Sequence, residues 1–112
     1  MSRADAAQAR HDPAPIFAAL GDSTRLELVT RLSDGRPMSI VQLTSGSRIT
    51  RQAVTKHLRV LEGAGLVRHR RVGRESRYSL VPKPIDQLRS YLDVLSAHWD
   101  DALLRLKTFV ER

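Results

Sequence analysis

Residues 51–67 read RQAVTKHLRVLEGAGLV, and this stretch decides the fold. Each residue of an α-helix is turned by about 100° from the one before it, so the stretch divides into two sides. The side expected to pack on a core consists of Val54, His57, Leu58 and Leu61. The opposite side is polar and consists of Arg51, Gln52, Thr55, Lys56 and Arg59. Because Thr is a good N-cap residue, the pattern predicts a helix over residues 50–64 that begins at Thr50.

The polar side of this helix carries no acid before Glu62, which lies near its end. An ordinary solvated helix surface also carries charge, but it usually mixes both signs. In the major groove of duplex DNA, Arg and Lys bind guanine, Gln binds adenine, and Thr contacts a phosphate or a thymine methyl. We therefore predict DNA contacts from Thr50, Arg51, Gln52, Thr55, Lys56 and Arg59.

A basic segment follows, LVRHRRVGRESRYSLV (66–81), which predicts two short strands joined at residues 72–75. Five arginines and one acid, Glu75, lie between Arg68 and Arg77. Such a hairpin can follow phosphates or place an arginine in a minor groove. An edge hairpin protected by charge is the alternative, and it explains two or three cations more easily than five. The predicted phosphate contacts of the hairpin are Arg70, Arg71, Arg74 and Arg77.

Two shorter helices are expected before this stretch. In the first, Asp22 or Ser23 caps the N-terminus and Asp34-Gly35 ends the helix. Its buried stripe is predicted to contain Leu26, Leu28, Val29 and Leu32. The second helix, over residues 39–45, buries Ile40 and Leu43 and ends at Gly46.

A long helix is expected at the C-terminal end, over about residues 84–111, because Pro82 and Pro84 end the hairpin. Its apolar residues recur in alternating steps of three and four: Ile85, Leu88, Leu92, Leu95, Trp99, Ala102, Leu106 and Phe109. These roughly three and a half heptads exceed what one small core can cover, so a second subunit is the expected partner. The alternative is that the helix folds back on its own domain.

Length and composition limit the possible functions. The 112 residues suit a single domain over residues 15–112, preceded by a flexible tail over residues 1–14. A net charge of +7 points to a polyanion, and the few aromatic residues argue against stacking on single strands. No apolar run approaches the roughly 20 residues of a membrane span, and no signal peptide is evident, so a cytoplasmic protein is expected.

Catalysis is not expected. The chain contains no Cys, which excludes disulfides, thiolate metal sites and cysteine nucleophiles. A phosphate-binding glycine loop and paired carboxylates beside a His are also missing from its sequence. We therefore predict that the protein is not an enzyme.

Three segments together resemble the ArsR-type (ArsR/SmtB) family of bacterial winged-helix repressors: ALGDSTRLELVTRL (19–32), residues 51–67, and GRESRYSL (73–80). The most specific piece is VTKHL (54–58) followed by LEGAGLV (61–67), similar to the family signature VSxHLxxLxxAGLV. The resemblance covers about residues 16–112. It implies a mainly α winged helix-turn-helix fold with a small β-hairpin (α+β), dimerising through its N- and C-terminal helices.

The same resemblance implies a homodimeric repressor that binds double-stranded DNA at a palindromic operator and blocks a promoter. The Thr50 helix would enter the major groove, and the basic hairpin would be the wing. The dimer interface is then expected to contain Ile16, Phe17, Leu88, Leu92, Leu95, Trp99, Leu106 and Phe109.

Many members of this family bind metals, but this chain departs from their ligand patterns. Where one family site uses Cys, the matching positions are near Ser39 and Val41, which cannot hold a thiophilic metal. On the last helix His98 and Asp101 are spaced as two ligands, although Ile85 and Gln87 stand near the completing positions. We therefore expect no metal cofactor, with His98 and Asp101 as the only candidate ligands.

The remaining histidines have simpler expected roles. His57 is expected to be packed and hydrogen-bonded, and His69 to be solvated or to contact a phosphate. Two alternative functions stay open. One is a sensor on the same scaffold that binds a metal or a small effector near Trp99, and the other is a winged-helix domain used only for protein interaction.

Overall fold

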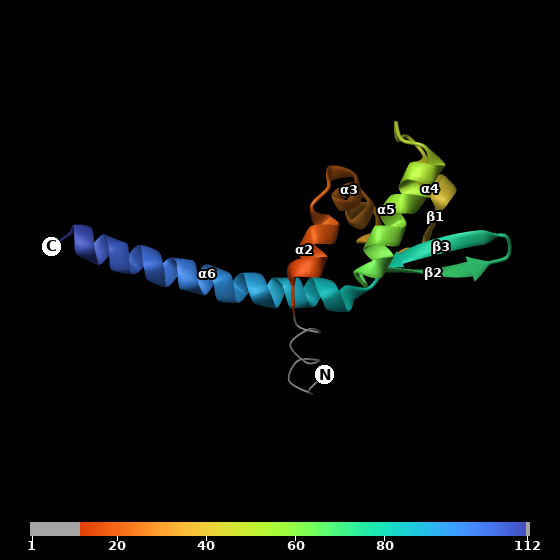
Figure 1. Cartoon of the computed structure of the whole chain (residues 1–112). Coiled ribbons are helices and arrows are strands. Elements are labelled where there is room, and N and C mark those ends of the chain that lie inside the picture. The colour runs from red at the N-terminus through yellow and green to blue at the C-terminus, as the bar shows by residue number, and fades with distance from the viewer. Residues whose placement is uncertain (1–11, 112) are drawn as a thin grey trace.

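The computed structural model describes residues 12–111. Five helices and three short strands make up this part of the chain (Figure 1). The helices are α2 (Ala14–Leu20), α3 (Ser23–Leu32), α4 (Ile40–Thr44), α5 (Arg51–Gly63) and α6 (Pro82–Val110). The strands are β1 (Met38–Ser39), β2 (Val67–Val72) and β3 (Glu75–Leu80). The expected mainly α fold with a small β-hairpin is confirmed, whereas most of the expected tail over residues 1–14 lies outside the described residues.

Side-chain caps fix where three helices begin. The Asp22 carboxylate accepts a hydrogen bond from the backbone N–H of Arg25 (3.0 Å) and so caps α3. Thr50 caps α5 in the same way, because its hydroxyl accepts from the backbone N–H of Ala53 (3.1 Å). Ser39 and Gln42 form a reciprocal capping box at α4. The caps expected at Asp22 and Thr50 are therefore confirmed.

The sheet is antiparallel, with strand order β1-β3-β2. The hairpin of β2 and β3 pairs Val67 with Leu80 and Val72 with Glu75, as expected. Gly73 has φ +63° in the connecting turn, a backbone conformation that glycine adopts without steric cost. The third strand was not expected, because only Met38 and Ser39 form it and they pair with a distant segment.

The core lies where α2, α3, α4, α5, the base of the sheet and the start of α6 meet. Its most deeply buried side chains are Leu32, Leu43, Val54, Leu58, Leu61, Leu66 and Val67. The prediction for Leu26 is wrong, since this side chain is 50% exposed while Leu28 is buried. Two expected interface residues also need correction: Ile16 and Leu88, at 6% and 7% exposure, fill the core of their own chain.

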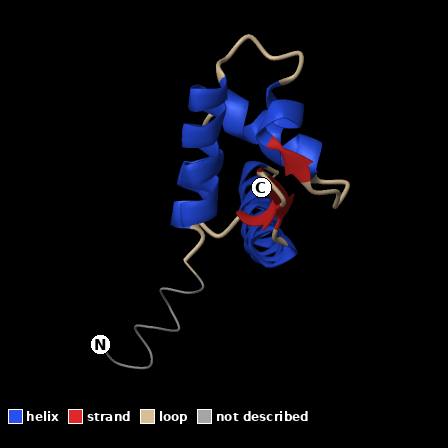
Figure 2. Ribbon diagram, turned by 90° about the vertical axis from the view of Figure 1, so that its right-hand side faces the viewer, coloured by secondary structure: helices blue, strands red, loops and turns tan. Residues whose placement is uncertain are grey.

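Helix α6 begins at Pro82, two residues earlier than expected, because a proline in the first helical turn gives up no helical hydrogen bond. Its first turns pack on the domain and the rest projects away from it (Figure 1). Figure 2 looks along α6 and shows the other helices gathered on one side of it. The radius of gyration is 18.5 Å, well above the roughly 13 Å of a compact domain of this length. Among residues 12–111, no helix combines the length and hydropathy that crossing a bilayer requires.

Candidate nucleic-acid interface

Helix α5 has the two sides that the sequence predicts. Val54, Leu58 and Leu61 are fully buried beneath it. On the opposite side Arg51, Gln52, Lys56 and Arg59 are exposed and Thr55 is half-buried. The helix follows α4 after a short turn, so the two form a helix-turn-helix pair in contact. The core therefore holds one side of α5 and leaves the polar side open to a partner.

An open groove of about 650 Å³ lies between α4 and α5. We call it the α4–α5 groove, and it is lined by Ile40, Val41, Arg51, Gln52, Thr55, Lys56 and Arg59. It brings together all the residues predicted on this helix except Thr50, whose hydroxyl is engaged as the cap. The sequence did not predict Val41 at this site. The signal was available, because Ile40 and Leu43 are three positions apart and share the inward side of α4, which leaves Val41 pointing outward.

The hydroxyl of Thr55 is also partly engaged. Its Oγ1 donates to the backbone carbonyl of Arg51 at 2.8 Å, one turn earlier in the helix. The hydroxyl proton is therefore used inside α5. Thr55 can offer a partner its methyl group or an oxygen lone pair, but the long donors of the groove are Arg51, Gln52, Lys56 and Arg59.

The acid at the end of α5 is turned toward the hairpin. Nδ1 of His69 lies 2.5 Å from Oε2 of Glu62, and its ring lies 5.4 Å from that of Tyr78. Burial raises the pKa of the Tyr78 hydroxyl, and the negative charge of Glu62 adds to this rise. His69 is half exposed but not simply solvated, because this side chain joins β2 to α5; its contact with a phosphate stays a prediction.

Strand pairing divides the arginines of the hairpin between two faces. Arg70 lies directly opposite Arg77, so these two like charges share one face. Arg71 lies opposite Ser76 on the other face, which also carries Tyr78, and Arg74 lies in the exposed turn. Arg77 is partly balanced by Glu75, whose Oε2 is 3.3 Å from its Nε. The four predicted arginines are all exposed, but they do not share a single face.

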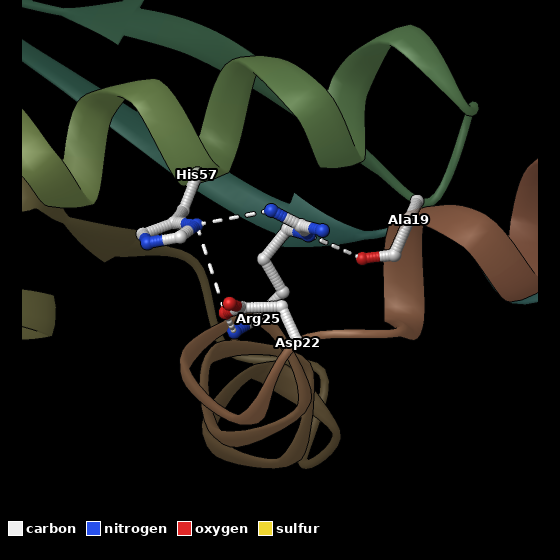
Figure 3. A network of polar contacts seen from close by, with 4 residues as sticks. All are labelled: Ala19, Asp22, Arg25 and His57. Atoms are coloured by element: carbon white, nitrogen blue, oxygen red, sulfur yellow. Dashed lines mark hydrogen bonds and ion pairs between the residues drawn. The ribbon is translucent and has the colours of Figure 1, made fainter.

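A polar network lies beneath α5 and joins three helices (Figure 3). The guanidinium of Arg25 donates from Nε to the carbonyl of Ala19 and from Nη1 to Nδ1 of His57 at 3.3 Å. Since arginine only donates, His57 accepts at Nδ1 and carries its proton on Nε2. Oδ2 of Asp22 lies 3.8 Å from the same Nδ1. The expectation that His57 is hydrogen-bonded is confirmed, whereas its partner Arg25 could not be predicted.

The backbone N–H of Arg25 also acts on the carboxylate of Asp22. This hydrogen bond holds the pKa of Asp22 below its usual value of 3.8, against a smaller opposing effect of burial. Electrostatic interactions with His57 and Arg25 lower the pKa of Asp22 further. The cap of α3 is therefore tied electrostatically to α5.

A second arginine fixes α4. The guanidinium of Arg31 donates from Nη1 to the carbonyl of Leu43 (2.6 Å) and from Nη2 to the carbonyl of Gln42 (2.8 Å). These carbonyls belong to the last turn of α4 and lack helical partners. Arg31 thereby holds α4 against α3, and α4 forms one side of the α4–α5 groove.

The projecting part of α6 exposes a long apolar stripe. Around it the large exposed side chains are Tyr91, Leu92, Val94, Leu95, Trp99, Leu103, Leu104, Leu106, Phe109 and Val110. Phe17 of α2 is partly exposed beside the same helix and makes an edge-to-face contact with Tyr91 at 5.9 Å between ring centroids. Phe17 and five of the predicted α6 residues thus lie on accessible apolar surface.

His98 and Asp101 are both exposed on α6. Within residues 12–111, no group of three His, Cys, Asp or Glu side chains gathers closely enough to hold a metal ion. Within the described part of one chain, His98 and Asp101 are therefore not joined by a third candidate ligand.

The amino-acid sequence also matches known proteins. The model of a helix-turn-helix domain family matches residues 20–70, which cover α3, α4, α5 and the start of β2. The HTH-type transcriptional regulator Rv2034 of Mycobacterium tuberculosis is 38% identical over 81 residues, or 72% of this chain and 75% of the relative. A transcriptional repressor SmtB homolog of Synechocystis is 35% identical over 75 residues, or 67% of this chain and 56% of the relative.

A solved structure agrees with these sequence matches. The ArsR-like transcriptional regulator from Rhodococcus sp. RHA1 superposes with a TM-score of 0.72 at 37% identity. The superposition covers 87% of this chain and 91% of that chain. The likeness therefore extends beyond the helix-turn-helix segment to most of the fold.

Proposed function

This chain belongs to the ArsR/SmtB family of winged helix-turn-helix transcriptional regulators, and from that premise we propose that it is a homodimeric repressor of a palindromic operator. Helix α5 of each subunit enters a major groove of duplex DNA, and the β2–β3 hairpin is the wing that contacts the flanking backbone. Bound in this way, the dimer blocks a promoter.

The observation that carries this proposal is the exposed side of α5. Three cations and one amide surround the α4–α5 groove, and the one acid of the helix, Glu62, is paired with His69 at the other end. Long donors on a helix whose back is fully buried suit the edges of bases and the phosphates beside them. Gln52 and Arg51 lie in the first turn, the part of a recognition helix that reaches furthest into the groove.

The apolar stripe of α6 supports the homodimer. An exposed stripe of this length on a projecting helix is unfavourable in water, and a second copy of the same helix covers it by symmetry. Leu92, Leu95, Trp99, Leu106 and Phe109 form the centre of the proposed interface, and Phe17 extends it. A palindromic operator requires that the two α5 helices of this dimer lie about 34 Å apart, which is one turn of DNA.

We propose that no metal cofactor takes part. The chain offers no thiolate, and His98 with Asp101 supplies only two ligands per subunit, so a closed tetrahedral site would require both subunits to bring these residues together across the dimer. Titration of zinc into the protein–DNA complex tests this point. The proposal requires that zinc neither binds in stoichiometric amount nor releases the DNA.

Selection of bound fragments from sheared genomic DNA of the source organism tests the function itself. We expect recovery of one or a few short palindromic sites located in promoters, bound more tightly than scrambled duplexes of equal length. Recovery of fragments without any shared motif would contradict a sequence-specific regulator. Failure to retain duplex DNA even at low salt would favour a domain used only for protein interaction.

A further inference from the structure

The α4–α5 groove contains an apolar surface that phosphate binding does not explain. Ile40 and Val41 of α4 lie in it beside the polar residues of α5. Ile40 is partly buried against the core, whereas Val41 is 53% exposed and takes no part in the core. An exposed valine among cations does not help to bind phosphates, and it is not needed to fill the core of its own chain.

The position of Val41 is fixed by its neighbours. The capping box of Ser39 and Gln42 sets the first turn of α4, and Arg31 holds the carbonyls of its last turn. Leu43 is buried on the opposite side of the same short helix. Val41 is therefore presented to the groove on a rigid frame, as a group that recognises a specific partner must be.

The cations around it identify that partner as the duplex itself. Within the major groove, the thymine C5-methyl is the apolar group on the base edges, and it distinguishes an A·T pair from a G·C pair. Thymine is paired with adenine, whose N6 and N7 suit the amide of Gln52 in the same groove. A surface that combines an apolar side chain with an amide and flanking cations matches such a base pair on a phosphate backbone.

We propose that Val41 contacts the methyl group of a thymine in each half of the operator and is a specificity-determining residue. This inference rests on the proposed function and deepens it, because it assigns α4 a direct part in sequence recognition.

Substitution of deoxyuridine for thymine tests the contact, since it removes only the methyl group. The probe is the tightest duplex that the wild-type protein selects from a random library, with each symmetry-related pair of thymines replaced in turn. The matched variants are Val41→Ala and, as control, Val60→Ala. Val60 is similarly exposed, at 45%, but lies outside the α4–α5 groove.

We expect one pair of replacements to weaken wild-type binding by about 15-fold, from roughly fourfold per methyl lost at each of two half-sites. Val60→Ala should keep this penalty. Val41→Ala should bind the thymine duplex about 15-fold more weakly than the wild type and lose less than about twofold further on the uracil duplex.

Several results would overturn the proposal. The proposal is contradicted if the wild-type protein binds every uracil-substituted duplex as tightly as the thymine duplex. It is also contradicted if the selected half-site contains no thymine. If Val41→Ala still showed the full loss of affinity on the uracil duplex, a residue other than Val41 would contact the methyl group. If Thr55→Ser abolished that loss instead, Thr55 would be the contact. An equal loss of Val41→Ala affinity for selected and scrambled duplexes would indicate a sugar contact. Failure of the proposed function is distinct, because then the wild-type protein selects no duplex at all.

Discussion

Nη1 of Arg25 lies 3.3 Å from Nδ1 of His57, which ties α3 to the underside of α5. The same guanidinium also donates to the carbonyl of Ala19 at the end of α2. Three helices therefore share one arginine, and the orientation of α5 depends on it. Asp22 lies 3.8 Å from the same Nδ1 of His57 and caps α3, so the polar network and the helix cap form a single unit.

The capping carboxylate predicts a loss of stability in acid. The pKa of Asp22 is lowered in the folded protein, so its ionised form stabilises the fold above about pH 3.8, and this contribution is lost as the pH falls through the lowered value. Urea unfolding of the wild type should therefore show a steeper decline in free energy below pH 4 than unfolding of Asp22→Asn. Asn keeps the capping role, which makes it the suitable comparison. Identical declines in the two proteins would show that the ionisation of Asp22 does not contribute to the pH dependence of stability.

Much of the fold could be predicted from local sequence signals. The caps at Asp22 and Thr50, the two sides of α5 and the β2–β3 hairpin all depend on residues close to one another in the chain. The capping box of α4 belongs to the same class of signal, since Ser39 and Gln42 are three positions apart in the sequence.

Features that depend on distant contacts could not be predicted. Arg25 meets His57 across 32 positions and Arg31 meets Leu43 across 12, and no periodicity encodes either contact. Strand β1 exists only because Met38 and Ser39 reach β3. Ile16 and Leu88 fit an apolar interface as well as a core, and only the packed structure shows that the core takes them.

A charge placed in the stripe of α6 should separate the subunits. Trp99→Glu puts two carboxylates into the proposed interface, and burying them there is unfavourable. Light scattering should then give the mass of one chain. The affinity for the operator should fall by about 100-fold or more, since the two half-sites are no longer bound together.

Ala97→Glu is the control for this variant, because Ala97 lies on the opposite side of α6 and is exposed. It should remain dimeric and bind DNA as the wild type does. A dimeric Trp99→Glu protein would place the interface somewhere other than the α6 stripe.

Two single variants should distinguish base contacts from phosphate contacts. Gln52→Ala removes a donor and acceptor from the α4–α5 groove, so it should lower the preference for operator over scrambled duplex. Arg74→Ala removes a charge from the exposed turn of the hairpin, so it should weaken both duplexes alike. The slope of log affinity against log salt concentration should become less negative by about two, because each of the two subunits loses one phosphate contact. An unchanged salt slope for Arg74→Ala would contradict a role for the hairpin turn.

The arginine pair across the hairpin predicts a conflict between stability and binding. Arg70 and Arg77 are directly opposite, and like charges in such a pair cost about 0.2–1 kcal/mol. Arg70→Thr should therefore stabilise the fold by a few tenths of a kcal/mol while it weakens duplex binding. Thermal unfolding and a DNA titration measure the two effects.

Arg71→Thr provides the comparison, because Arg71 faces Ser76 and not another arginine. It should weaken binding without stabilising the fold. Equal stabilisation by both variants would mean that the pairing of Arg70 with Arg77 carries no penalty.

The most direct test of the account is the mass of the protein–operator complex, measured by sedimentation with one selected duplex at low salt. Two subunits joined through α6, each with its α5 helix in a major groove, require two chains per duplex, and the free protein should already have the mass of two chains. A complex with one chain per duplex, formed by a protein that sediments as a single chain, would contradict the account.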